Sequence, residues 1–434
     1  MRKFSTSEYL RAATAALIQA PGYLIRPRLS EGSIVRFQEG RIKKLLRHAF
    51  HHCEFYRQKY RDHGVQPEDF RSLADLELFP TVSKEELISA MECGALGLPD
   101  QATIESVSSG SSGRVIRVHH GVRNTSAYAV GRYRILNMTG ELMPWSKTLY
   151  VYTSEFPARS LFGLFPSRFV STLNDLHDTL KTIRSYRPHI LCIYPSRLIE
   201  LMSIISAQEG PGLGIRFISL NSETSSIEQR RTMAEFFQCS VLDEYSTEEL
   251  GWVASECEHG SYHLWEDMCY VEVVEPDADR SAGPGQLGEI VGTNLHNFTT
   301  PFIRYRQGDL GAIDSQPCHC KRRFRKLQSL VGRKNDAFKF ADQILSPSFL
   351  LDSVYELLLD GKFPIVDFCM IQEDLSTVRF QYVAHGDVRN NLESRLEESL
   401  RRRFPREISI LIERPNTLEK TATGKRNPII SKIK

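Results

Sequence analysis

Short apolar runs alternate with helix-like stretches through the middle of the chain. The runs at residues 149–153, 190–193 and 215–220 have the length and composition of buried strands. Residues 195–208 and 227–237 show the spacing of helices. Strands and helices in alternation predict an α/β layer built on a parallel sheet.

The chain before about residue 105 has a helical and polar pattern. Its apolar positions at helical spacing are Phe37, Ile42, Leu45, Leu46 and Phe50. A turn at Pro80 is followed by Ser83-Lys84-Glu85-Glu86, a sequence typical of a helix start. We expect this part of the chain to form helices whose role is packing.

The pattern changes to period two beyond Tyr270. Residues 270–275 alternate, and the turn Gly283-Pro284-Gly285 precedes a second predicted strand at residues 288–293. We therefore expect a β-rich subdomain over about residues 265–332.

The end of the chain has a pattern of its own. Strands are predicted at residues 366–371 and 378–383, and a charged helix is predicted at residues 389–403. The predicted fold class is α/β. Residues 1–332 form a large N-terminal region of α/β layers that includes the β-rich subdomain, and residues 337–434 form a small α+β domain.

Composition and charge exclude several classes of function. The chain has 55 Lys and Arg against 53 Asp and Glu, and this balance argues against nucleic acid or an anionic membrane as the main partner. The apolar run at residues 12–18 is too short for a signal core, so we expect a surface helix and no membrane span. Nine scattered cysteines favour a reducing compartment over a disulfide framework. We expect a cytoplasmic protein that acts on small molecules.

The clearest local signal for chemistry is the run Ser108-Ser109-Gly110-Ser111-Ser112-Gly113-Arg114. Two glycines allow a tight turn, and four hydroxyls can donate to anionic oxygens, as in loops that bind phosphate. The same composition is also typical of a flexible turn or linker. Other motifs have to decide between the two interpretations.

Further motifs follow in order along the chain. They are Tyr245-Ser246-Thr247-Glu248-Glu249, Ile303-Arg304-Tyr305-Arg306-Gln307-Gly308-Asp309, Gly332-Arg333 and Thr421-Ala422-Thr423-Gly424-Lys425-Arg426. Each alone also fits a solvated helix start, a capped turn or an exposed lysine. Together with the loop they resemble the ordered motifs of the adenylate-forming superfamily. The closer similarity is to the phenylacetate-CoA ligase family, through Ile193-Tyr194-Pro195-Ser196, Glu256-Cys257, Pro301-Phe302-Ile303-Arg304-Tyr305 and Cys318-His319-Cys320.

The resemblance implies a reaction and the residues that carry it. A substrate carboxylate attacks the α-phosphorus of ATP, so negative charge has to be stabilised while pyrophosphate leaves. The loop from Ser108 to Arg114 would hold the β- and γ-phosphates, and Glu249 would bind Mg²⁺. Lys425 would bridge the carboxylate and the α-phosphate.

The resemblance also implies the nucleotide contacts. Asp309 would accept hydrogen bonds from the ribose hydroxyls, and Arg333 would touch ribose or phosphate. Further nucleotide contacts would be Ser222, Glu223, Tyr245 and Ser246. This chain departs from the family at Val115, Ser246 and Glu248, where relatives usually have Pro, Gly and Thr.

A hinge at residues 333–336 is implied as well, with Asn335 or Asp336 as its pivot, and it would make the C-terminal domain mobile. The expected function is ATP-dependent formation of an acyl-AMP from a small aryl or cyclic acid, followed by transfer to CoA. Candidates for the acid pocket are Tyr152, Phe156 and Tyr194, which would equally suit an ordinary core.

Two alternatives stay open. An amine or a carrier-protein thiol in place of CoA would make the chain an amide synthetase or a loading enzyme. The departures at Val115, Ser246 and Glu248 also fit a catalytically inactive nucleotide-binding homologue. A homodimer is a further open possibility.

A second constellation consists of Cys257, His263, Cys318 and Cys320, spaced as Cys-x5-His and Cys-x-Cys. Four such ligands would close a tetrahedral structural zinc site. The alternative is a packed cysteine, a strand histidine and an exposed cysteine pair.

Overall fold

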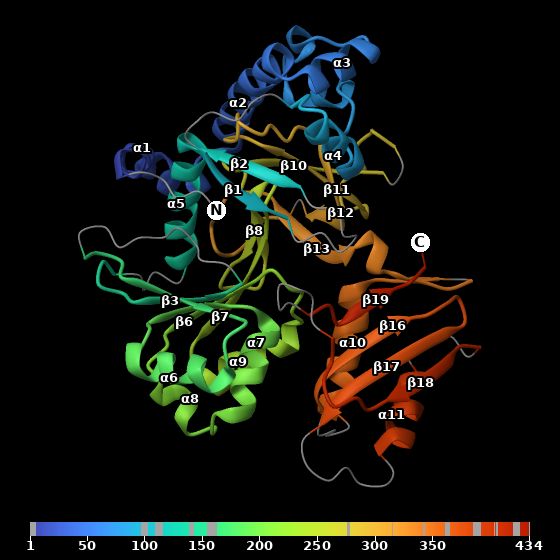
Figure 1. Ribbon diagram of the computed structural model, residues 1–434. Coiled ribbons are helices and arrows are strands. Elements are labelled where there is room, and N and C mark those ends of the chain that lie inside the picture. The colour runs from blue at the N-terminus through green and yellow to red at the C-terminus, as the bar shows by residue number, and fades with distance from the viewer. Residues whose placement is uncertain are drawn as a thin grey trace. The chain divides into compact units, whose positions relative to one another are not determined.

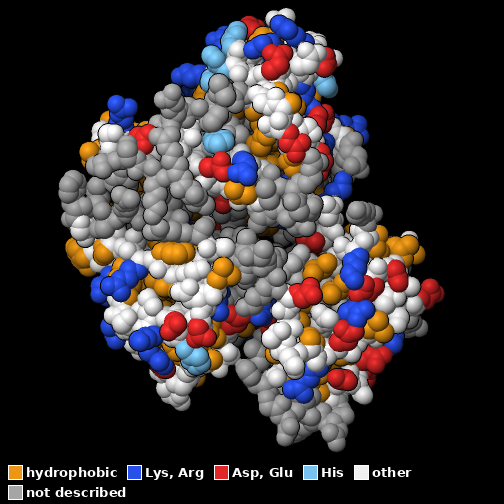
Figure 2. All heavy atoms as spheres, in the orientation of Figure 1, with side chains coloured by type: hydrophobic (Ala, Val, Ile, Leu, Met, Phe, Trp, Pro, Cys, Tyr) orange, Lys and Arg blue, Asp and Glu red, His pale blue; other side chains and the backbone are white. Residues whose placement is uncertain are grey.

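The computed structural model describes residues 6–96, 103–108, 116–138, 143–153, 163–275, 278–314, 316–341, 343–360, 365–384, 392–402, 404, 407–419 and 426–433. The chain divides into two compact units. The first unit comprises residues 1–138 and 244–330, and the second comprises residues 139–243 and 331–434. Over the described ranges, no helix is long and apolar enough to cross a membrane. Figure 2 shows acidic and basic side chains interspersed on the visible face, in line with the balanced charge.

Helices dominate the start of the first unit (Figure 1). They are α1 (Thr6–Ile25), α2 (Glu31–His52), α3 (Glu54–Asp62), α4 (Lys84–Glu92) and α5 (Val122–Leu136), with 3-10 turns η1 (Arg26–Arg28), η2 (Pro67–Asp69) and η3 (Leu73–Leu78). The predicted helix start is confirmed, because the Ser83 hydroxyl accepts a hydrogen bond from the backbone N–H of Glu86. The predicted apolar stripe of α2 is also confirmed, since Ile42, Leu45 and Leu46 are fully buried.

Antiparallel strands form the rest of the first unit. They are the hairpin of β1 (Thr103–Val107) and β2 (Arg117–Gly121), and β8 (Gly251–Glu256), β9 (Tyr262–Leu264), β10 (Cys269–Val274), β11 (Gly288–Asn294) and β12 (Tyr305–Asp314). Two more strands, β7 (Ser240–Thr247) and β13 (Lys326–Arg333), run across the division between the units. The period-two pattern predicted β10 and β11 but not β8. All six residues of β8 are buried, so no alternation marks it.

A parallel sheet forms the first part of the second unit, as predicted. Its strands run in the order β6 (Phe217–Asn221), β5 (Ile190–Ile193), β3 (Thr148–Tyr152) and β4 (Ser167–Ser171). The helices of this part are α6 (Leu176–Tyr186), α7 (Pro195–Ile204), α8 (Glu209–Gly212) and α9 (Ile227–Phe237). The predicted helix at 195–208 was too long, because Ile205 is extended and Ser206 accepts hydrogen bonds from Glu209 at the start of α8.

The C-terminal part of the second unit is α+β. Its elements are η4 (Lys334–Asp336), β14 (Phe338–Lys339), β15 (Ile344–Leu345), α10 (Pro347–Asp360), β16 (Ile365–Gln372), β17 (Thr377–Ala384), α11 (Leu392–Arg401), β18 (Ser409–Glu413) and β19 (Ile429–Ser431). The sheet order is β18-β17-β16-β19, and its core includes Leu351, Phe368, Phe380 and Leu396. Both predicted strands and the charged helix are confirmed.

Arg304 is a fully buried charged residue that connects several segments of the first unit. Its side chain has no exposed surface, and the guanidinium binds both carboxylate oxygens of Glu272, at 3.0 and 3.2 Å. It also donates to the backbone carbonyls of Phe79 and Asp279. The Arg304 carbonyl accepts a hydrogen bond from the N–H of Val82. One buried cation therefore ties the start of β12 to β10 and to the segment before α4.

Removal of this cation should destabilise the fold. In the Arg304→Met variant the Glu272 carboxylate stays buried without its partner, which costs about 3–5 kcal/mol of unfolding free energy. Urea denaturation followed by circular dichroism measures the loss. The control is Arg280→Gln, which breaks an exposed pair with Glu275 and should cost less than about 1 kcal/mol. Equal urea midpoints for the two variants would contradict the anchoring role of Arg304.

Candidate active site

Asp309 lies where the ladder of β12 is interrupted. The pairing of β11 with β12 shifts between Glu289 and Val291, which leaves extra residues in β12 around position 308. Gly308 takes a φ of +77°, a conformation that residues with a side chain rarely adopt. The phenol of Tyr245, on β7, donates a hydrogen bond of 2.6 Å to Oδ2 of Asp309. The bulge and the phenol together orient the Asp309 carboxylate.

Glu249 lies in the turn between β7 and β8. The phenol of Tyr305, at the start of β12, donates to Oε1 of Glu249 at 3.3 Å. The side-chain amide of Asn294 donates to the Glu249 carbonyl at 3.0 Å. Burial raises the pKa of the Glu249 carboxyl. Burial, followed by the charge of Glu249, raises the pKa of the Tyr305 phenol, which therefore keeps its proton and can donate.

The two tyrosine hydrogen bonds connect the motif at residues 245–249 with the motif at residues 303–309. Tyr245 of the first motif orients Asp309 of the second, and Tyr305 of the second orients Glu249 of the first. All four residues belong to the first unit. Asp309 on β12 and Glu249 in the turn between β7 and β8 are therefore both oriented by tyrosines, and their carboxylate oxygens are suited to binding hydroxyls and a divalent cation.

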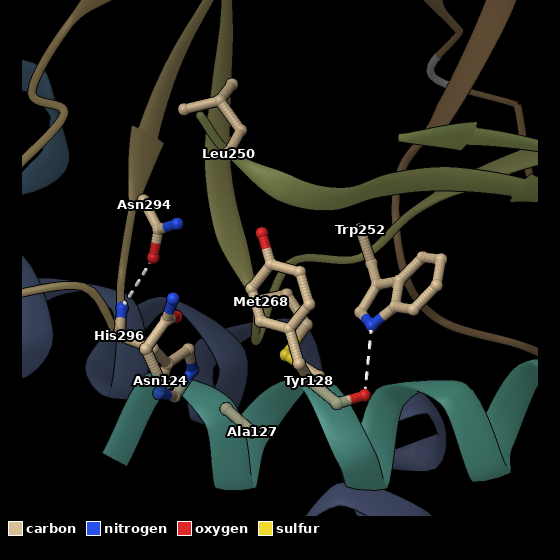
Figure 3. Close-up of a pocket in the computed structure, with 8 residues that line it drawn as sticks. All are labelled: Asn124, Ala127, Tyr128, Leu250, Trp252, Met268, Asn294 and His296. Carbon is tan, nitrogen blue, oxygen red and sulfur yellow. Dashed lines mark hydrogen bonds between the residues drawn. The ribbon is translucent and has the colours of Figure 1, made fainter. Parts of the chain in front are cut away.

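A small cavity is lined in part by Leu250 and Asn294 (Figure 3). Side chains from α5, β8 and neighbouring loops line it, among them Tyr128, Leu250 and Trp252. The Trp252 indole N–H donates to the Tyr128 carbonyl at 3.2 Å, which joins β8 to α5. The cavity has no space for a water molecule, so it is a packing gap and not an acid pocket.

The predicted phosphate loop begins directly after β1, the first strand of the hairpin. The N–H of Ser108 donates to the Ile116 carbonyl at 2.9 Å, and the Ser108 hydroxyl accepts from the Ile116 N–H at 2.9 Å. These bonds join the two ends of the loop above β1 and β2. Ser109, Gly110, Ser111, Ser112, Gly113, Arg114 and Val115 lie outside the described residues, so their phosphate role stays a prediction.

Two tyrosines and an asparagine lie at the carboxyl ends of three adjacent parallel strands in the second unit. Tyr152 ends β3, Tyr194 follows β5, and Asn221 ends β6. The rings of Tyr152 and Tyr194 stack at 5.5 Å with 16° between their planes, and the Asn221 amide donates to the Tyr152 hydroxyl. Ligands of α/β sheets bind at this edge. The third predicted pocket residue, Phe156, lies outside the described residues.

Other predicted nucleotide contacts also belong to the second unit. Ser222 has a φ of +67° in the turn after β6. Glu223 accepts hydrogen bonds of 3.0 Å from the backbone N–H and the hydroxyl of Ser196, at the start of α7. Arg333 is exposed at the end of β13. Lys425 lies outside the described part of the chain.

The predicted hinge residues form a short turn. Asn335 and Asp336 lie in η4, where the Asp336 carboxylate accepts a hydrogen bond of 3.2 Å from the Asn427 side chain. The pivot itself stays a prediction.

The four predicted metal ligands lie together in the first unit. All their ligand atoms lie within 4.8 Å of one another. The sulfur atoms of Cys257 and Cys318 are 3.7 Å apart, and the sulfur of Cys320 is 3.1 Å from Nε2 of His263. Zinc with Zn–S bonds of about 2.3 Å holds two sulfurs about 3.8 Å apart, so the spacing fits. Nδ1 of His263 lies 3.1 Å from the Phe324 carbonyl, and a hydrogen bond there leaves Nε2 as the ligand atom.

Known proteins resemble this chain over most of its length. No protein-family model matches it. A phenylacetate-coenzyme A ligase of Pseudomonas putida is 26% identical over 323 residues, which are 71% of this chain and 72% of the relative. A phenylacetate-coenzyme A ligase of Escherichia coli strain K12 is 26% identical over 339 residues, 73% of this chain and 75% of the relative.

The chain is similar in sequence to the phenylacetate-coenzyme A ligases.

Solved structures share the fold of this chain. A 2-hydroxyisobutyryl-CoA ligase in the postadenylation state, in complex with 2-HIB-AMP, matches with a TM-score of 0.78 at 19% identity. The match covers 94% of this chain and 92% of that chain. The chain therefore shares the fold of this CoA ligase.

Sequence reasoning missed the two hydrogen bonds by which Tyr245 and Tyr305 orient Asp309 and Glu249. Tyr305 lies inside a recognised motif, but its contact with Glu249 depends on how two distant strands are placed. Asn294 gave no signal, because an isolated Asn in a strand is also typical of a turn edge.

Proposed function

We propose that this protein activates a small carboxylic acid with ATP and transfers the acyl group to coenzyme A. The observation that carries the proposal is the crossed bracing of Asp309 and Glu249 by Tyr245 and Tyr305. The relatives named phenylacetate-coenzyme A ligase, and the neighbour that holds an acyl-AMP, support the same reaction.

The reaction has two steps. A carboxylate oxygen of the acid attacks the α-phosphorus of ATP, and the bond to pyrophosphate breaks. The CoA thiol then loses its proton and attacks the acyl carbon, and AMP leaves with its electron pair. Asp309 would accept hydrogen bonds from the two ribose hydroxyls, which fixes the α-phosphate relative to the acid.

The buried Glu249 carboxylate fits Mg²⁺. It is a hard oxygen ligand that Tyr305 orients, and the neighbouring Glu248 adds negative charge. Mg²⁺ bound there would neutralise charge on the phosphates of ATP. Lys425 would add a second positive charge at the α-phosphate.

The stacked pair of Tyr152 and Tyr194 supports an aryl or cyclic acid. A flat ring could extend this stack at the carboxyl edge of the parallel sheet. We further place the protein in the cytoplasm, because a reducing compartment suits nine free cysteines. A homodimer stays a prediction.

The role of Lys425 is tested by separating the two steps. Lys425→Ala should abolish exchange of labelled pyrophosphate into ATP with phenylacetate, because no cation remains to bridge the reacting groups. Thioester formation from synthetic phenylacetyl-AMP and CoA should be largely unchanged. Equal pyrophosphate exchange in the wild type and the variant would refute the assignment.

The role of Asp309 is tested by ATP binding. Asp309→Asn should raise the Kd for ATP by about 10- to 100-fold, since a hydrogen bond to a charged group contributes about 1.5–3 kcal/mol. Tyr245→Phe removes only the bracing phenol and should raise Kd by less. Isothermal titration calorimetry measures both. Asp314→Asn, at the far end of β12, is the matched control, and an Asp309→Asn variant that binds like this control would exclude the ribose contact.

We also propose that Cys257, His263, Cys318 and Cys320 hold a structural zinc ion. The metal would join the β8–β9 turn to the loop before β13. Elemental analysis of protein purified without chelator should find one zinc per chain. The Cys318→Ser variant should lose the zinc and unfold at a lower temperature, whereas Cys93→Ser, at an exposed cysteine outside the cluster, should retain it. Wild-type protein without zinc would remove the proposal.

A further inference from the structure

Arg426, in the C-terminal part of the second unit, makes polar contacts with three carboxylates. Its backbone N–H donates to Oε1 of Glu223 at 2.9 Å. Its guanidinium donates to Oε1 of Glu200 at 2.7 Å and also pairs with Asp367 of β16. The side chain is 17% exposed. Backbone and side chain of one residue therefore bind two carboxylates from the parallel-sheet part of the same unit.

The two acceptors of Arg426 are held in place before it binds. Glu200 lies on α7, and its other oxygen accepts a hydrogen bond of 2.8 Å from Arg197. Arg197 is itself fixed by donation to the Asn174 carbonyl. Glu223 is fixed by Ser196, whose backbone N–H and hydroxyl both donate to it. Ser196 and Arg197 at the start of α7 thus orient both carboxylates, and binding Arg426 requires little reordering.

The opposite side of the contact is also rigid. Arg426 lies three residues before β19, which pairs in parallel with β16 from Met370 onward. Asp367, on β16, lies against the guanidinium on this side. A second contact between the same two parts is the hydrogen bond from Gln229 of α9 to the hydroxyl of the half-buried Tyr355 of α10. Arg426 is therefore clamped between α7 and the C-terminal sheet.

We propose that Arg426 is a positioning residue that fixes the chain carrying Lys425 to α7 and to the turn at Glu223. Arg426 directly follows Lys425 in the sequence. The inference rests on the proposed function, because it assigns Arg426 to the step in which Lys425 acts. Glu223 gains a second role. It accepts a hydrogen bond from the backbone N–H of Arg426 in addition to those from Ser196. Glu200, which no motif marks, becomes the main side-chain partner.

The test separates the two half-reactions. Arg426→Gln should slow ATP–pyrophosphate exchange with phenylacetate by about 10- to 100-fold, the equivalent of one or two hydrogen bonds to a charged group. Thioester formation from phenylacetyl-AMP and CoA should change less than about threefold, because Lys425 is not needed there. Glu200→Gln should show the same split. Arg402→Gln, which breaks the exposed pair of Arg402 with Glu398 at the end of α11, is the matched control and should change neither rate.

Two further variants exclude a loss of folding as the cause. Arg426→Lys keeps the charge but not the paired donors, so it should recover part of the exchange rate. The double variant that swaps the two charges, Arg426→Glu with Glu200→Arg, should catalyse ATP–pyrophosphate exchange faster than Arg426→Glu alone. An Arg426→Gln variant that slows both half-reactions equally, or neither, would overturn the proposal.

Hydrogen exchange tests the clamp without any substrate. In Glu200→Gln, the peptide covering residues 426–433 should exchange its amide hydrogens at least about tenfold faster than in the wild type. Peptides from α2 and α3 serve as the internal reference and should not change. Unchanged exchange at 426–433 would overturn the clamp. A wild type without pyrophosphate exchange on any acid tested would instead refute the proposed function, and hydrogen exchange would still decide on the clamp.

Discussion

The ion pair between Arg304 and Glu272 is the constraint on which the candidate site depends. A fully buried guanidinium is tolerated only where its donors are satisfied, and here carboxylate oxygens and backbone carbonyls satisfy them. This anchoring fixes the first residues of β12. Tyr305 is the next residue along the chain, and Asp309 follows within the same strand. The positions of both carboxylates of the site, Asp309 directly and Glu249 through Tyr305, thus depend on the buried cation.

The division of chemistry between the two units follows from this arrangement. The first unit supplies two carboxylates that are suited to hydroxyls and a divalent cation. It also contains the cysteine and histidine cluster, which would join the β8–β9 turn to the loop before β13. The second unit supplies the stacked tyrosines, Glu223 and the clamp around Arg426. The residues predicted to contact the nucleotide therefore come from both units, whereas the stacked tyrosines and the contacts of Arg426 belong to the second unit.

The sequence predicted features whose signal is local. The α2 stripe, the cap at Ser83 and the parallel strands could be read from periodicity and capping residues, and the motifs marked Asp309 and Glu249 by their order. Features that depend on distant packing left no such mark. Strand β8 shows no alternation because both of its faces are buried. The crossed tyrosines and the Glu200 partner of Arg426 depend on which strands and helices meet in space.

The central claim is that the oxygen of a carboxylate attacks the α-phosphorus of ATP. The most direct measurement supplies phenylacetate labelled with ¹⁸O in its carboxylate, together with ATP and CoA, and follows the label by mass spectrometry. If phenylacetyl-AMP forms and CoA displaces AMP, one labelled oxygen appears in AMP and none appears in pyrophosphate. Product formed with unlabelled AMP, or with the label in an inorganic phosphate, would contradict the account.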